Sequence, residues 1–103
     1  MTLTSWRAFE VLIPRIGRPT MHVVGYSNEG GEGRVSSSFT KLDAERGQVI
    51  SKSGRAYRLE GPPGLHPDAD YVWQQWQSTW EAAVLKDVSS ELFEVITMAA
   101  RQT

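Results

Sequence analysis

The chain contains no cysteine. Disulfide bonds, thiolate metal ligands and a cysteine nucleophile are therefore excluded, and we expect a cytoplasmic protein. Long apolar runs are absent too: the stretch at residues 21–25 is among the longest, whereas a membrane-spanning helix needs about 20 such residues. The first residues include no basic segment that leads into an apolar one, so we expect no secretory signal.

Histidine is scarce, and no motif for catalysis or phosphate binding is present. The two histidines, His22 and His66, match no metal-ligand spacing, and no serine lies in a nucleophile-elbow motif. The glycine-rich residues 28–33 lack the Lys-Ser/Thr pair of a phosphate loop and include two glutamates, which would repel an anion. We interpret this segment as a mobile loop that folding does not require. The sequence therefore predicts no catalytic residue, no metal site and no cofactor.

The net charge is −1, which favours neither nucleic acid nor an acidic surface as a partner. The charge is unevenly placed, however. Residues 1–60 carry nine Lys/Arg against six Asp/Glu, and residues 61–103 carry two against six. A basic sheet beside acidic helices is the plain interpretation, and a basic binding face on the sheet is the alternative.

Segments with strand character precede segments with helical character. Apolar patterning predicts strands at residues 4–13, 21–27, 34–42, 48–52 and 55–60. Apolar residues occur in both alternating sets of the first strand, so we expect it to be covered on both faces. The chain is predicted to be one domain over residues 1–103, mainly β over 1–60 and mainly α over 65–103. Its fold class is α+β, with an antiparallel sheet of about five strands followed by two helices packed on one face.

The helical half begins after a stiff Gly-Pro-Pro-Gly segment. Pro67 suits the first turn of a helix, and the acidic residues that follow complement the helix dipole, so we predict a helix from Pro67 to about residue 82. Residues 81–86 either extend this helix or cross back as a short segment. Residues 87–91 (DVSSE) predict the start of a second helix, with a serine cap and an acidic first turn.

Three tryptophans fall on one stripe of the first helix. Trp73, Trp76 and Trp80 recur at three- and four-residue steps, which is the spacing of a buried helix face. We therefore expect Trp76 and Trp80 to be core residues. A stripe that stacks bases or sugars is the alternative, and it is disfavoured because no Lys or Arg lies within residues 59–85.

A tight Ser-Gly turn sets a register for the last two predicted strands. If Lys52 pairs with Arg55, then Ile50 lies opposite Tyr57 on the core face, and Val49 lies on the other face. A slip of one residue would exchange the two faces.

The face opposite the core face combines an apolar centre with a basic rim, as protein interfaces do. Its predicted members are Val35, Phe39, Lys41, Val49, Ala56 and Arg58. Both helices are expected on the other side of the sheet, so something else has to cover this surface: the first strand, a second copy of the chain or a partner protein. A sheet that curls and buries both faces within one chain is the alternative.

Three short motifs lie within residues 33–76. They are a Ser-Gly-x-x-Tyr-x-Leu hairpin, a Gly-Pro-Pro-Gly turn and a Tyr-Val-Trp-x-x-Trp helix, carried by Ser53, Gly54, Tyr57 and Leu59, by residues 61–64 and by residues 71–76. With these motifs the segment resembles small bacterial proteins of unassigned function. The resemblance implies a bacterial, phage or plasmid origin and no mechanism.

The sequence favours a small non-enzymatic binding or regulatory protein that acts by protein–protein contact, either with a partner protein or with a second copy of the chain. One alternative is an inhibitor of a host defence complex, anti-CRISPR-like and encoded by a phage or plasmid. Another is a small hydrolase or nuclease built on His22, His66 and nearby acids. We expect neither nucleic acid nor a membrane as a direct ligand.

Overall fold

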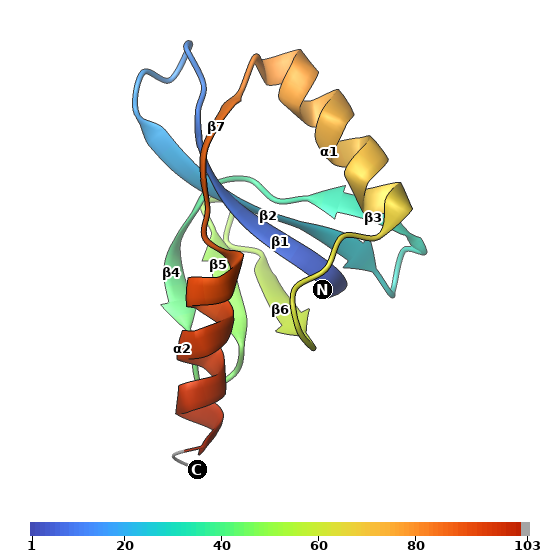
Figure 1. Cartoon of the computed structure of the whole chain (residues 1–103), viewed down its shortest axis with the longest axis vertical. Coiled ribbons are helices and arrows are strands. Elements are labelled where there is room, and N and C mark those ends of the chain that lie inside the picture. The colour runs from blue at the N-terminus through green and yellow to red at the C-terminus, as the bar shows by residue number, and fades with distance from the viewer. Residues whose placement is uncertain (102–103) are drawn as a thin grey trace.

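The computed structural model of the chain describes residues 1–101 and confirms an α+β fold in which the sheet precedes two helices (Figure 1). The strands are β1 (Thr2–Leu12), β2 (Pro19–Ser27), β3 (Glu32–Val35), β4 (Phe39–Asp43), β5 (Gln48–Ser51), β6 (Ala56–Glu60) and β7 (Ala83–Asp87). The helices are α1 (Pro67–Trp80) and α2 (Ser89–Arg101). Two strands are added to those expected: the segment 34–42 is broken into β3 and β4, and residues 83–87 cross back as β7.

The sheet closes on itself because β1 pairs with β2 along one edge and with β6 and β7 along the other. The strand order is β3-β2-β4-β5-β6-β1-β7, and β2 pairs with β1 as well, so β1, β2, β4, β5 and β6 form a five-stranded barrel. The pairing of β1 with β6 is parallel, unlike the other pairings. The register between β1 and β2 shifts between Thr4 and Arg7, where Ser5 has a positive φ of 46°. Such irregularities bend a strand and help a sheet to curl.

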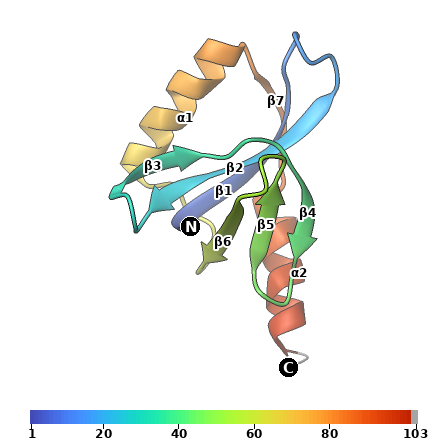
Figure 2. The same cartoon turned by 180° about the vertical axis from the view of Figure 1, so that it is seen from behind.

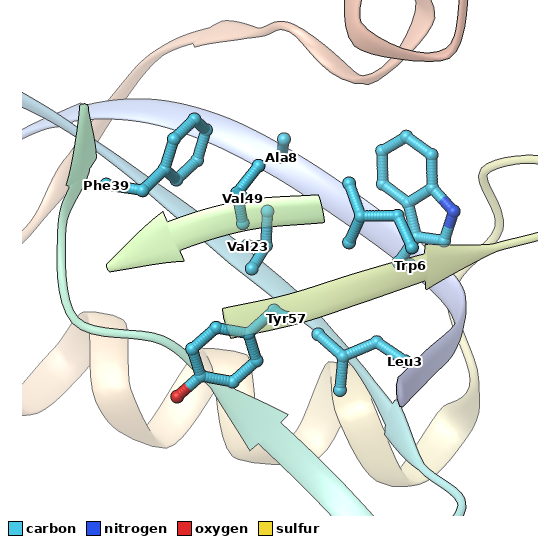
Figure 3. Packing of buried hydrophobic residues seen from close by; sticks show 8 residues of the cluster. Leu3, Trp6, Ala8, Val23, Phe39, Val49 and Tyr57 are labelled. Carbon is cyan, nitrogen blue, oxygen red and sulfur yellow. The ribbon is translucent and has the colours of Figure 1, made fainter. Parts of the chain in front are cut away.

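Two apolar clusters lie on opposite faces of β1, as the sequence predicted for this strand. The barrel interior holds Leu3, Trp6, Ala8, Val23, Phe39, Val49, Tyr57 and Leu59 (Figure 3). The second cluster lies between the outer face and α1, and holds Val11, Ile13, Val24, Ala69, Trp73 and Ala82.

The helices therefore cover different surfaces instead of sharing one face. Leu92, Phe93 and Ile96 of α2 pack against the barrel interior, whereas Ala69 and Trp73 of α1 pack against its outside. In both views the two helices lie at opposite ends of the molecule (Figures 1 and 2). The physical reason is that β1 is apolar on both faces, so each face needs its own cover. Within residues 1–101, neither helix has the length and apolar character that crossing a membrane requires.

The register predicted for β5 and β6 is wrong by one residue. Val49 pairs with Tyr57, and Ile50 pairs with Ala56. The turn is longer than expected, because the N–H of Ser51 donates to the Arg55 carbonyl at 2.9 Å. Three residues then lie in the loop, and the last of them, Gly54, takes a left-handed conformation with φ 88°, as three-residue hairpin loops require. The slip exchanges the two faces and turns Val49 into the core.

The start of α1 follows the local sequence signals. His66 is the N-cap, and its Nδ1 accepts a hydrogen bond from the N–H of Asp68 at 3.0 Å. Pro67 occupies the first turn, as predicted, and Glu81 ends the helix in a left-handed conformation. The Gly-Pro-Pro-Gly segment before the helix is fixed to the barrel, because the indole N–H of Trp6 donates to the Gly61 carbonyl at 3.0 Å.

Candidate binding groove

The interaction surface predicted from the sequence does not exist in the form expected. Its apolar centre is buried: Phe39 is 4% exposed and Val49 is fully buried, and both point into the barrel interior (Figure 3). Val35 packs against the cluster beneath α1. The remaining members are the half-buried Ala56 and the exposed Lys41 and Arg58. The prediction failed because the sheet closes, which is the alternative that the sequence left open, and because β5 is shifted by one residue.

The tryptophans of α1 differ in burial along the helix. Trp73 is 5% exposed and stacks on Phe9, with ring centroids 4.7 Å apart. Trp76 is half-buried and lies between Trp73 and His22, with its ring centroid 5.1 Å from that of Trp73 and 4.7 Å from that of His22. Trp80 is 42% exposed, so its assignment to the core is wrong. The start of α1 lies close to the sheet, whereas its last turn lies beside the tip of the β1–β2 hairpin.

A hollow of about 370 Å³ opens beside the exposed tryptophan. We call it the tryptophan groove. It is lined by Ile13, Ile16, His22, Ser36, Ser37, Ser38, Lys52, Trp76 and Trp80. Ile16 at the hairpin tip is 45% exposed, so an aromatic and an aliphatic side chain both face solvent at its rim. The volume is at the lower end of the range of about 300–1,000 Å³ that is typical of ligand sites.

His22 in the groove is held in place by two hydrogen bonds. Its Nδ1 lies 2.9 Å from the Ser36 carbonyl oxygen, and its Nε2 lies 2.8 Å from the Thr20 hydroxyl. Burial lowers the pKa of His22 below its ordinary value, and the bond to Ser36 only partly opposes this effect. A neutral ring with its proton on Nδ1 satisfies both contacts, since Nδ1 then donates to Ser36 and Nε2 accepts from Thr20. This histidine is therefore structural and has no free nitrogen for a ligand.

The segment between β3 and β4 supplies the polar part of the groove. Ser36 is tied to β2, because its N–H donates to the Val23 carbonyl at 2.9 Å and its hydroxyl accepts from the Val23 N–H at 3.0 Å. The Ser38 carbonyl accepts from the N–H of Lys52 at 2.7 Å. In the part of the chain that the structure describes, no hydrogen bond engages the main-chain groups of Ser37 or the N–H of Ser38. These groups are available to a ligand.

Basic side chains surround the tryptophans in space, although none is near them in the sequence. Lys52 lines the groove, and a neighbouring hollow of about 490 Å³ shares Lys52 and adds Arg18. A smaller hollow shares Trp80 and adds Arg15. None of these three cations forms an ion pair within residues 1–101. The sequence around the tryptophans contains no Lys or Arg, so it gave no indication of the basic residues that lie near them in the fold.

Lys52 could not have been placed beside the tryptophans from the sequence alone. It lies in the β5–β6 turn, and only the folded sheet brings that turn to α1. A usable signal was the unbalanced positive charge of residues 1–60, which favoured a basic binding face as an alternative.

The second histidine lies away from the groove. His66 caps α1 and stacks on Tyr26, with ring centroids 4.3 Å apart, so its role is structural as well. Among residues 1–101, no three His, Cys, Asp or Glu side chains lie close enough to hold a metal ion.

Strand β7 also carries exposed apolar side chains, as α2 does at Val95 and Met98, but the sheet edge that β7 forms is protected. Val84 and Leu85 are 41% and 50% exposed. The pairing of β7 with β1 shifts at this point, so that Leu85 is left out of the register, and Lys86 follows directly. Bulges and lysines of this kind prevent an edge strand from pairing with another chain. The tryptophan groove is therefore the better candidate site.

We compared the chain with protein-family models, with curated proteins and with solved structures, and none of them matches it.

Proposed function

We propose that the protein is a non-enzymatic binding module that acts by contact with another protein chain, and that the tryptophan groove is its contact surface. The observation that supports the proposal is the exposed pair Trp80 and Ile16 at the rim of a hollow that also offers free main-chain groups. Tryptophan is among the residues that contribute most to protein interfaces, because it buries a large area at little cost in conformational entropy. The cysteine-free composition suits a reducing compartment such as the cytoplasm.

A hydrolase or nuclease has less support. Both histidines on which it would depend are engaged in structural contacts, His22 with Ser36 and Thr20, and His66 with the start of α1. A general base needs a free nitrogen within reach of the substrate. An inhibitor of a host defence complex would be one case of the activity proposed here, since such an inhibitor also acts by binding a protein.

The proposal can be tested with a displayed library of random peptides. Peptides are selected on the wild-type protein, and their affinity is then measured for Trp80→Ala and for Tyr71→Ala. Tyr71 is 67% exposed on the same helix and does not line the groove, so it is a matched control. We expect Trp80→Ala to weaken binding about 30-fold, as the loss of an interface hot spot of about 2 kcal/mol does, and Tyr71→Ala to leave it within twofold.

The same variants test whether the partner is a second copy of the chain. Sedimentation equilibrium of the wild type would show a dimer that Trp80→Ala dissociates and Tyr71→Ala does not. Two results together would contradict the proposal. The selected peptides would bind both variants equally, and the wild type would either stay monomeric or form a dimer that Trp80→Ala leaves intact.

A further inference from the structure

The polar groups around the tryptophan groove are mostly donors. Lys52 contributes an ammonium group, and the N–H groups of Ser37 and Ser38 are unpaired within the described part of the chain, against one unpaired acceptor, the Ser37 carbonyl. Among residues 1–101, no carboxylate lines this groove. His22 adds no charge near neutral pH, because burial lowers its pKa below the ordinary value and both its nitrogens are engaged. A ligand that complements this set has to supply acceptors, and a carboxylate supplies the strongest.

The positive and the apolar parts of the site lie at different ends. The hollow that shares Lys52 with the groove also contains Arg18, and of the acids within the described residues Glu10 alone lines it. On the other side, Trp80 is shared with a hollow that contains Arg15 and Glu81, whose charges balance, at the C-terminal end of α1. A helix C-terminus carries partial negative charge and repels anions. An anionic group is therefore favoured beside Lys52 and Arg18, and an apolar group beside Trp80.

We infer that the groove takes an extended acidic segment of a partner protein, in which a large apolar side chain contacts Trp80 and Ile16 and a nearby carboxylate contacts Lys52 and Arg18. This inference rests on the proposed function and adds the chemical class of the ligand. The free main-chain groups at Ser37 and Ser38 suit an extended segment, whose own main chain pairs with them.

Single-stranded nucleic acid also combines aromatic stacking with negative charge, but the site suits it less well. A strand that tracks the groove would carry one phosphate per nucleotide past Glu10 and Glu81, which line the two flanking hollows. One ring face of Trp76 is already covered by Trp73, since the two rings stack with centroids 5.1 Å apart and an angle of 16° between their planes. Trp80 alone is left as a stacking platform.

The test repeats the peptide selection with wild type, with Lys52→Met and with Lys41→Met. Methionine keeps the apolar stem and removes the charge. Lys41 is exposed on β4 and does not line the groove, so it is the matched control. We expect peptides selected on the wild type and on Lys41→Met to carry Asp or Glu within three residues of a large apolar side chain, and peptides selected on Lys52→Met to show a weaker enrichment, since Arg18 remains.

The strongest wild-type peptide is then synthesised with its acids and with Asn or Gln in their place. We expect the neutral peptide to bind the wild type about tenfold more weakly, and the difference between the two peptides to be smaller for Lys52→Met, in which Arg18 remains. Thermal unfolding of each variant confirms that it is folded.

The outcomes separate the two proposals. Selected peptides that depend on Trp80 but show no acid preference would overturn this inference and leave the proposed function standing. Binding that does not depend on Trp80 would overturn both. A labelled oligothymidine that binds more tightly than the best peptide, and loses affinity in Trp80→Ala and Lys52→Met, would replace the acidic peptide by a nucleic acid strand.

Discussion

Gly33 in β3 is the position where the structure predicts the largest effect from the smallest change. A Cβ atom at this residue would lie 2.5 Å from the Asp68 carbonyl oxygen and 2.7 Å from the Ala69 Cα. Both are main-chain atoms of the first turn of α1, so they cannot turn aside as a flexible side chain does. In Gly33→Ala, either α1 lifts from β3 or the strand bends, and in both cases the packing around Ala69 and Trp73 is loosened.

The magnitude follows from two opposing effects. Overpacking of this kind typically costs about 1–3 kcal/mol. Replacing glycine by alanine also reduces the freedom of the unfolded chain, which stabilises by about 0.4–1 kcal/mol. Gly33 is not in a left-handed conformation, so no backbone strain is added. We therefore expect a net loss of about 1–2 kcal/mol, which corresponds to a melting temperature lower by about 5–15 °C for a chain of this size.

The assay is urea and thermal unfolding, followed by tryptophan fluorescence and circular dichroism, with Gly30→Ala as control. A Cβ at Gly30 would meet only the side chains of Glu32 and Ser27, at 3.3 Å, and Glu32 is exposed and free to move. We expect Gly30→Ala to change the free energy of unfolding by less than about 0.5 kcal/mol or to stabilise slightly. If Gly33→Ala proves as stable as Gly30→Ala, the close docking of α1 on β3 is refuted.

The expectation that all of residues 28–33 form a dispensable loop is already wrong at its end, because Glu32 and Gly33 belong to β3.

Three further predictions concern the core, the joint between β1 and α2, and pH. Trp73→Ala should lower the free energy of unfolding in urea by about 3–5 kcal/mol, as for other large buried aromatics, whereas Trp80→Ala should lower it by less than about 1 kcal/mol. Equal losses would mean that the two side chains differ less in burial than the structure shows. Ser89→Ala should lower the free energy of unfolding by about 1–3 kcal/mol, because the buried Ala8 N–H, which donates to the Ser89 hydroxyl at 2.8 Å, loses its acceptor. Ser90→Ala at the neighbouring exposed position is the control. Similar unfolding midpoints for the two variants would contradict the role of this hydrogen bond. Stability should fall as the pH drops below about 6.5, because burial lowers the folded-state pKa of His22, so that the unfolded chain binds a proton that the folded chain does not. In His22→Gln the urea midpoint should change less between pH 7.5 and pH 5.5 than it does in the wild type. This range lies above the titration of Asp87, because partial burial raises the pKa of that carboxyl but hydrogen bonds from Ser89 and the charge of Arg7 lower it overall. An equal change of the urea midpoint in both proteins would remove His22 as the cause.

The sequence by itself determined the elements that depend on neighbours in the chain. Pro67 at the start of α1 and the serine at the start of α2 are local signals, and the structure places a helix boundary at each of them. The presence of apolar residues on both sides of β1 likewise predicted that both faces are covered. Such signals are reliable because caps, prolines and periodicity act within a few residues.

Only the tertiary structure decided the register of β5 and β6, the closure of the barrel and the surroundings of the tryptophans. Side chains alternate with a period of two along a strand, so a single extra residue in the Gly54 turn was enough to move Val49 from the predicted surface into the core. Closure depends on the parallel pairing of β1 with β6, which are more than 40 residues apart in the chain. The groove unites Lys52 with Trp76 and Trp80, which are more than 20 residues away in the chain, so no local pattern contains it.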